Sequence, residues 1–221
     1  MFKYETHLHT KPASLCASAT AKEQLEHYKS LGYDGVFITN HFYDFNVNND
    51  DEYIEMLNRF YNDYELGVVI GNDIGIKVFS GVEITYCGTD FLIYGLNKEW
   101  FAAHNDIYKM DIKTKLELFR DNGALVIQAH PFREAGYIDH IRLFPRSVHG
   151  VEVFNACRNE LENSMAKLYA DKYGLIHFSG SDNHSGSKQN RYGGMQSNVP
   201  IVSVEDFIDK VYNGTLSIIC E

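Results

Sequence analysis

Two histidines separated by one residue, His7 and His9, stand at the end of the first apolar stretch of the chain. Residues i and i+2 of a strand point to the same face, so both imidazoles can reach one point above the strand end. Neutral imidazole is the commonest metal ligand among side chains, and two converging rings supply half of a tetrahedral site. Further histidines and carboxylates follow later apolar runs in the same way: His41, Glu83, His130, Asp182 and His184. This recurrence predicts a centre that holds more than one metal ion.

The number of candidate ligands indicates the chemistry of the centre. A catalytic zinc ion uses three protein ligands and keeps one position open, so the candidates suffice for two or three ions that share a ligand. Glu83 is the natural bridge because a carboxylate offers two oxygens, and we expect Glu83, Asp182 and His184 to act in catalysis. Metal ions ~3.5–4 Å apart activate water and stabilise the attacking and leaving oxygens of a displacement, as in phosphate-ester hydrolysis. Nitrogen and oxygen donors fit zinc, manganese or iron without choosing among them.

The elements that must position these ligands alternate between strand-like and helix-like runs over the whole chain. A capping box from Thr20 to Glu23 predicts the start of a helix that ends near residue 31. Continuous apolar strands separated by helices predict a mainly parallel sheet that helices cover on its outer face. Because the candidate ligands follow strand ends, they favour a closed or nearly closed barrel, in which these ends meet at one rim. The expected strands are 2–6, 35–39, 77–85, 90–96 (a possible hairpin with the preceding one), 124–129, 150–154, 175–179 and 216–219, and the later helices are 51–65, 107–122, 160–172 and 204–212.

Composition limits the kinds of partner. The 221 residues suit one domain, 1–221, and the net charge of −10 argues against a nucleic-acid or anionic membrane surface. A small anionic substrate remains compatible, because bound metal reverses the local charge. No run approaches the ~20 apolar residues of a membrane span, and the first residues carry no signal-peptide pattern. The four cysteines form no CxxC pair, which predicts free core thiols in a reducing compartment. We therefore expect a soluble, cytoplasmic protein, and the sequence leaves its oligomeric state open.

An ordered set of short motifs resembles the PHP family, the polymerase and histidinol phosphatase domain, over residues 1–184. The motifs are Thr6-His7-Leu8-His9-Thr10, Ile38-Thr39-Asn40-His41, Gly81-Val82-Glu83, Ala129-His130-Pro131 and Gly180-Ser181-Asp182-Asn183-His184. The resemblance implies a distorted (β/α)7 barrel with a di- or trinuclear site and phosphoesterase activity. By this resemblance, the first metal would be surrounded by His7, His9, Glu83 and Asp182. Glu83 and His130 would reach a second metal, and His41 and His184 would serve a third.

The chain departs from the family pattern around the third metal. Many members carry an aspartate or histidine shortly after the first pair of histidines, where residues 14–17 here offer only Cys16. Many also place a histidine on the strand after the bridging glutamate, and residues 91–95 offer none. The acidic residue often found before the second-motif histidine is replaced by Asn40. We expect a third ion to bind weakly, with water or substrate phosphate completing its ligands, and Cys16 to be a buried core thiol rather than a ligand.

Four polar side chains in the predicted rim loops are candidates for substrate binding. A guanidinium can hold a phosphate group with two parallel hydrogen bonds, in a geometry that lysine cannot match. An amide at a strand end can add a further polar contact. The candidates are Arg133, Asn155, Arg158 and Arg191.

These observations predict a metal-dependent phosphoesterase that hydrolyses a small phosphomonoester, histidinol phosphate being one possibility. A first alternative is amidohydrolase-like cleavage of a C–N or carboxylic ester bond, which metal-containing barrels with paired histidines also perform. A second is a metal-dependent binding module without catalysis. A nucleic-acid exonuclease is disfavoured by the acidic charge of the chain.

Overall fold

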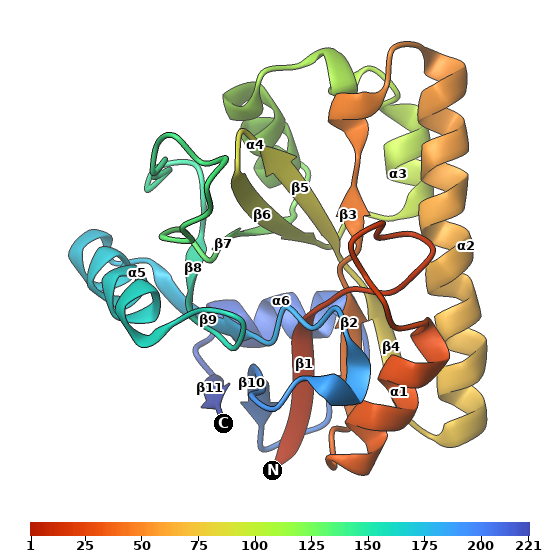
Figure 1. Ribbon diagram of the computed structural model, residues 1–221, viewed down its shortest axis with the longest axis vertical. Coiled ribbons are helices and arrows are strands. Elements are labelled where there is room, and N and C mark those ends of the chain that lie inside the picture. The colour runs from red at the N-terminus through yellow and green to blue at the C-terminus, as the bar shows by residue number, and fades with distance from the viewer.

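The computed structural model describes the backbone of residues 1–221 and every side chain except that of Phe45. Its strands form two sheets, one at each end of the molecule in the view of Figure 1. The first sheet has the order β11-β10-β1-β2-β4, with β1 Phe2–Leu8, β2 Gly35–Ile38, β4 Lys77–Ser80, β10 Gly193–Ser197 and β11 Leu216–Cys220. The second has the order β3-β5-β6-β7-β8-β9, with β3 His41–Phe42, β5 Val82–Tyr86, β6 Thr89–Tyr94, β7 Leu125–Ala129, β8 Gly150–Asn155 and β9 Ile176–Gly180.

The two sheets share strands that pass from one to the other. β2 continues into β3 after two residues, and β4 continues into β5 across Gly81. A Cβ atom on Gly81 would lie 2.8 Å from Thr39 Cγ2 and 2.9 Å from Tyr94 Cε1, so the backbone crosses here at a separation that only glycine allows. On the other side, Thr6 of β1 donates a side-chain hydrogen bond to the Ser179 carbonyl of β9. The strands surround a common interior, but the ladders break at these crossings. The prediction was a closed or nearly closed barrel, and the structure shows no closed one.

The strand directions are mixed rather than mainly parallel. The pairs β1–β2, β2–β4, β3–β5, β7–β8 and β8–β9 are parallel, whereas β6 runs antiparallel to both β5 and β7. The predicted hairpin is confirmed: Cys87 and Gly88 form its two-residue turn with φ of 48° and 78°. Because β6 is reversed, its first residues lie beside the last residues of β5 and β7. Figure 1 shows this hairpin in the upper part of the molecule.

Six α-helices cover the sheets: α1 Ala21–Ser30, α2 Asp50–Ile74, α3 Lys98–Ala103, α4 Ile112–Asp121, α5 Glu160–Tyr173 and α6 Val204–Tyr212. The capping box of α1 is present as predicted. α2 is longer than the predicted helix 51–65, and Gly67 and Gly71 explain the difference. These glycines weaken a helical pattern, but a Cβ on Gly67 would lie 2.8 Å from Ile38 Cδ1, so they let the helix approach the sheet. The sequence did not predict α3 or β10, the strand that pairs with β1 and β11.

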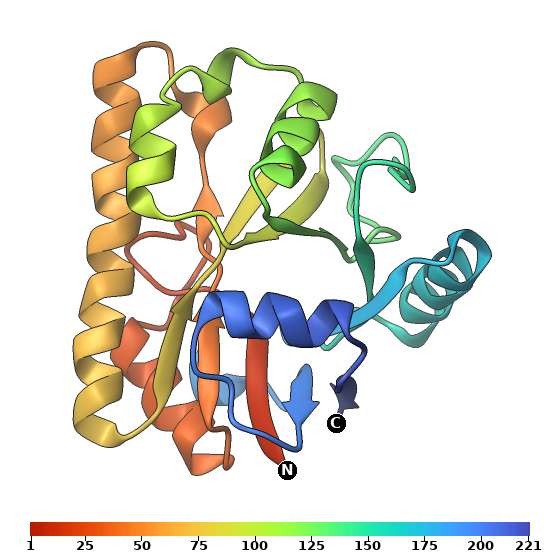
Figure 2. The same cartoon turned by 180° about the vertical axis from the view of Figure 1, so that it is seen from behind.

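An aromatic layer fills the interior below the strand ends that carry the histidines. Phe207 of α6 packs against Phe37, Tyr94 and Phe178, with ring centroids 4.4, 5.5 and 6.0 Å apart. Figure 2 shows α6 lying across the strands from behind, while α2, α3 and α4 cover the outer faces. This packing leaves the opposite end of the interior to polar side chains.

Two expectations from composition are settled by the structure. Among the described residues, no helix is long and apolar enough to cross a membrane. The four cysteines are free as predicted, but all are exposed, so their assignment to the core is wrong. The reason is local: Cys16 and Cys157 lie in loops, Cys87 lies in the hairpin turn, and Cys220 ends the edge strand β11.

Candidate metal centre

All seven predicted ligands lie together at one rim of the strands. His7 lies on β1 with His9 just after it, His41 lies on β3 and Glu83 on β5, and the remaining three directly follow β7 and β9. Their nitrogen and oxygen atoms form overlapping groups whose members lie within 4.8 Å of one another. The groups are His7, His9 and Asp182; Glu83, Asp90 and His130; His9, His41 and His184; and His7, His130 and Glu152.

Glu83 occupies the middle of this cluster. It is 1% exposed, and both of its carboxylate oxygens face imidazole nitrogens. Its Oε1 lies 3.2 Å from His7 Nε2 and 3.5 Å from His130 Nε2, and its Oε2 lies 3.3 Å from His9 Nε2 and 2.7 Å from His41 Nδ1. Burying a carboxylate is costly unless cations compensate its charge. The two oxygens therefore fit a bridge between bound cations.

Asp90 is a candidate ligand that the sequence analysis missed. It is 1% exposed, its Oδ2 lies 3.8 Å from His130 Nε2, and Arg133 Nη2 forms an ion pair with it at 3.0 Å. Most of the other candidate ligands stand near the carboxyl ends of their strands or just beyond them. Because β6 is antiparallel, its rim residue stands near its start, directly opposite Ala129 and next to His130. The hairpin signal at Cys87-Gly88, read together with this reversal, would have pointed to Asp90.

Glu152 orients the ring of His7 and joins the neighbouring ligands. His7 Nδ1 lies 2.9 Å from Glu152 Oε1, and an ionised carboxylate only accepts hydrogen bonds, so His7 donates there and turns Nε2 to the cluster. Glu152 Oε2 accepts hydrogen bonds from the His130 backbone at 3.0 Å and from Asn155 Nδ2 at 2.8 Å. Asn155 Nδ2 also lies 3.4 Å from Asp182 Oδ2. The structure thus places Asn155 in a buried network behind the ligands, and substrate contact by Asn155 stays a prediction.

The backbone beneath two ligands is held in an uncommon conformation. His130 and Asp182 have positive φ angles of 24° and 53°. Such conformations cost on the order of 1–3 kcal/mol each and gather at functional sites. The Glu5 carboxylate holds the backbone in place by accepting hydrogen bonds from His7 N at 2.8 Å and Ser181 N at 2.9 Å. Burial raises the pKa of Glu5 to about 7, although these hydrogen bonds act to lower it.

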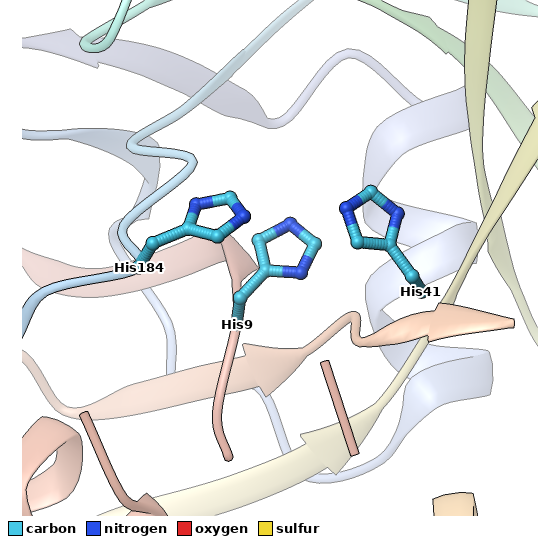
Figure 3. Close-up of side chains that lie close together, drawn as sticks. All are labelled: His9, His41 and His184. Atoms are coloured by element: carbon cyan, nitrogen blue, oxygen red, sulfur yellow. The ribbon is translucent and has the colours of Figure 1, made fainter. Parts of the chain in front are cut away.

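The group formed by His9, His41 and His184 lies at the open edge of the centre. Figure 3 shows His9 between His41 and His184, with ring centroids 4.6 and 4.0 Å from theirs. His184 Nδ1 donates to the Asp182 carbonyl at 2.8 Å, and the ring also forms a side-chain hydrogen bond with Cys16. The side chains of His41 and His184 are 15% and 28% exposed, whereas His9 is fully buried. Cys16 interacts with both exposed rings, and although desolvation acts to raise its pKa, His184 and His41 lower it to about 6.

The pKa values of the buried ligands depend on burial and on the charges of the neighbouring ligands. Burial acts to lower the pKa of His7, but Glu152, Asp182 and Glu83 carry it well above the usual value. Burial and the neighbouring His184 lower the pKa of His9. Burial acts to raise the pKa values of Glu83 and Asp182, but imidazoles hold both well below the usual range. The cluster therefore combines ionised carboxylates with imidazoles, the donor types that a divalent metal centre uses.

The three predicted arginines differ in their distance from the ligands. Arg133 is held at the centre by Asp90 and donates to the Gly88 carbonyl at 3.2 Å. A cleft of about 500 Å³ runs from Arg133 along the loop to Ile141. Arg191 donates to the Arg158 carbonyl at 2.9 Å, and its guanidinium lies 5.3 Å from the centre of the Phe154 ring. The geometry brings Arg133 to the centre, and substrate contact by any of the three stays a prediction.

No family model and no curated protein sequence matches the chain. Among solved structures, a two-domain protein from Bacteroides vulgatus containing a predicted PHP-like metal-dependent phosphoesterase has a TM-score of 0.71 and 17% identity. The match covers 99% of this chain and 64% of the Bacteroides protein, so this chain spans less than two thirds of the length of that protein. PsfC from Pseudomonas syringae has a TM-score of 0.67 and 15% identity, over 99% of this chain and 91% of the other. An amidohydrolase from Chromobacterium violaceum, with bound sulfate and no metal, has a TM-score of 0.53 and 13% identity. This match covers 99% of this chain and 98% of the amidohydrolase.

These comparisons show a similarity of fold between the chain and the solved structures. The chain has the mixed α/β fold, with parallel strand pairs, that PHP-like phosphoesterase and amidohydrolase structures share. At these identities the likeness extends to the fold alone. The resemblance predicted from the short motifs is thereby supported at the level of fold.

Proposed function

We propose that this protein is a metal-dependent hydrolase of small phosphomonoesters. The observation that carries the proposal is Glu83, a buried carboxylate whose two oxygens face four imidazoles from different parts of the chain. Arg133 stands beside the cluster and favours phosphate esters, because a guanidinium pairs with phosphate oxygens, and a cleft that begins at Arg133 offers room for an organic group. The structural likeness to a protein described as containing a PHP-like phosphoesterase agrees with this reading.

Two or three divalent ions, zinc, manganese or iron, would be held by the described donors and would supply activated water and charge neutralisation. Glu83 offers one oxygen toward His7 and His130 and the other toward His9 and His41, which suits a bridging ligand. Asp182 faces His7 and His9 through Oδ1 at 3.5 and 3.4 Å.

The remaining side chains bind and orient the ester. Arg133 brings a fixed positive charge to the rim, where it can hold a phosphate oxygen while Asp90 keeps the guanidinium in place. His184 stands at the open edge with its side chain 28% exposed, in position to meet the substrate. The cleft beside Arg133 can take the organic group, and its size suits a small molecule.

His9, His41 and His184 are proposed to bind a third ion. Since two of these rings are partly exposed, the ion has fewer protein ligands enclosing it than the buried groups offer. We expect it to bind more weakly and to fill mainly when phosphate is present. Calorimetric titration with metal, with and without inorganic phosphate, tests this point, and three equally tight sites without phosphate would contradict it.

Hydrolysis of p-nitrophenyl phosphate tests the main proposal. We expect turnover that a chelator abolishes and that added manganese, zinc or iron restores. Glu83→Gln should lose both bound metal and turnover, whereas His177→Gln, which alters a histidine paired with Asp171 outside the centre, should keep both. Absence of turnover on a broad panel of phosphoesters by fully metal-loaded protein would refute the proposal.

The amidohydrolase-like structure keeps a second reaction open, the hydrolysis of C–N or carboxylic ester bonds. The same metal-loaded preparation should therefore be assayed on amides, cyclic amides and p-nitrophenyl acetate. Turnover of these compounds with none on phosphoesters would select this alternative. Tight metal and phosphate binding without turnover of either class would indicate a binding module.

A further inference from the structure

A buried chain of hydrogen bonds connects helix α2 to the ring of His9. Asp63 of α2, which is 4% exposed, accepts hydrogen bonds from Asn40 Nδ2 at 3.1 Å and from the Thr10 hydroxyl. Asn40 Oδ1 lies 2.8 Å from Ser14 Oγ, and Ser14 Oγ lies 3.0 Å from His9 Nδ1. Thr10, Ser14, Asn40 and His9 are fully buried, so each polar atom must find its partner within the protein.

The direction of each hydrogen bond in this chain is determined by its neighbours. The Thr10 backbone N–H donates to Asn40 Oδ1 at 2.7 Å, and Asn40 Nδ2 donates to Asp63 and to Thr10 Oγ1 at 2.8 Å. These contacts fix which end of the Asn40 amide is oxygen. The only proton available between Asn40 Oδ1 and Ser14 Oγ is therefore that of the Ser14 hydroxyl.

Once its proton is given to Asn40, the Ser14 oxygen can only accept. It accepts from the His41 backbone N–H at 3.0 Å, and its remaining lone pair faces His9 Nδ1. Two acceptors cannot face each other at 3.0 Å without a proton between them, so His9 Nδ1 must carry that proton. The lone pair of the neutral ring is then on Nε2, which lies 3.1 Å from His7 Nε2 and 3.3 Å from Glu83 Oε2.

We infer that Ser14 is a positioning residue: it holds His9 in the tautomer with the proton on Nδ1 and so reserves Nε2 for cations. The inference rests on the proposed function for its purpose, but the tautomer itself is a property of the metal-free protein. The carboxylates of Glu83 and Asp182 lie 3.3 and 3.4 Å from Nε2 and would favour a proton there, so Ser14 decides between two competing arrangements. His9 contributes to two of the donor groups, so its tautomer affects both.

Long-range proton–nitrogen NMR of the metal-free protein at pH 7 tests the inference directly. The neutral ring is identified by the nitrogen shifts themselves, and its signals are assigned by their loss in His9→Gln. We expect the nitrogen shifts of a ring protonated at Nδ1. A ring protonated at Nε2 in the wild-type protein overturns the inference, whether or not the protein proves to be a hydrolase.

Variants separate the positioning role from a general structural one. Ser14→Ala removes the acceptor, so we expect the His9 ring to move toward the Nε2-protonated tautomer and metal affinity to fall about 10- to 100-fold. The matched control is Ser30→Ala, which removes an exposed hydroxyl at the end of α1 and should change neither quantity. An unchanged tautomer in folded Ser14→Ala would also overturn the inference.

Discussion

Metal binding should release protons, and its affinity should rise steeply with pH. In the metal-free protein, burial acts to lower the pKa values of His7 and His41, but the facing carboxylates raise both well above 6.5. Both rings therefore carry a proton at neutral pH that a cation must displace. Each displaced proton contributes about 1.4 kcal/mol per pH unit, so two give about 2.7 kcal/mol, or about a hundredfold in affinity per pH unit.

The same shifts set the pH dependence of the stability of the metal-free protein. A raised folded-state pKa contributes stability that is fully present below the unfolded value of about 6.5. That stability is lost as pH rises through the folded-state pKa. We therefore expect the melting temperature of the metal-free protein to fall above pH 6.5, and the increase in melting temperature on adding metal to grow over the same range.

Titration calorimetry in two buffers of different ionisation enthalpy counts the released protons. We expect at least two protons for the wild-type protein, because the pKa values of His7, His41 and His184 are all raised, and one fewer for His41→Gln. His177→Gln should release the same number as the wild type. Metal binding without proton release, or a metal-free protein that becomes more stable above pH 6.5, would refute the reasoning.

Three further substitutions have expected outcomes. Glu83→Gln should lower bound metal, measured by elemental analysis, and turnover together, because an amide lacks the charge and has one oxygen; unchanged metal content would contradict the bridging role. Lys115 forms an ion pair with the fully buried Asp44. Lys115→Met removes this pair and should lower the free energy of unfolding, measured by denaturant titration, by about 3–5 kcal/mol. A loss below about 1 kcal/mol would contradict this expectation. Gly180→Ala would place a Cβ 2.4 Å from that of His7, so metal affinity should fall at least tenfold, on the order of other losses around metal ligands; wild-type affinity would show that the backbone adapts.

The candidate ligands could be found from the sequence because their signal is local. His7, His9, Glu83 and Asp182 each stand just before or just after the end of an apolar run, and a strand end needs only a few residues to be recognised. The convergence of strand ends then follows from the preference for parallel pairs, and the structure confirms that these side chains share one rim. The capping box of α1 was recognisable for the same reason, since Thr20 and Glu23 are three residues apart.

The rest depended on contacts between distant segments. Asp90 enters the centre because β6 is antiparallel, a direction that the composition of the strand does not carry. The chain from Asp63 to His9 joins residues more than fifty positions apart, so no local pattern signals it. Gly67 and Gly71 weaken the helical pattern of α2, and only the packing of that helix against Ile38 and Val78 shows why they are there.

The break between the two sheets gives the candidate centre a mechanical role. His7 lies on β1 of the first sheet with His9 just beyond its end, whereas Glu83 and Asp90 belong to the second. Bound cations would cross-link the two sheets where their ladders are discontinuous. Loading with metal would then decide whether the protein unfolds as one cooperative unit or opens first along this seam. A copy that has not received its metal would be the copy most readily cleaved by proteases, so metal supply would control how long the protein persists as well as whether it reacts.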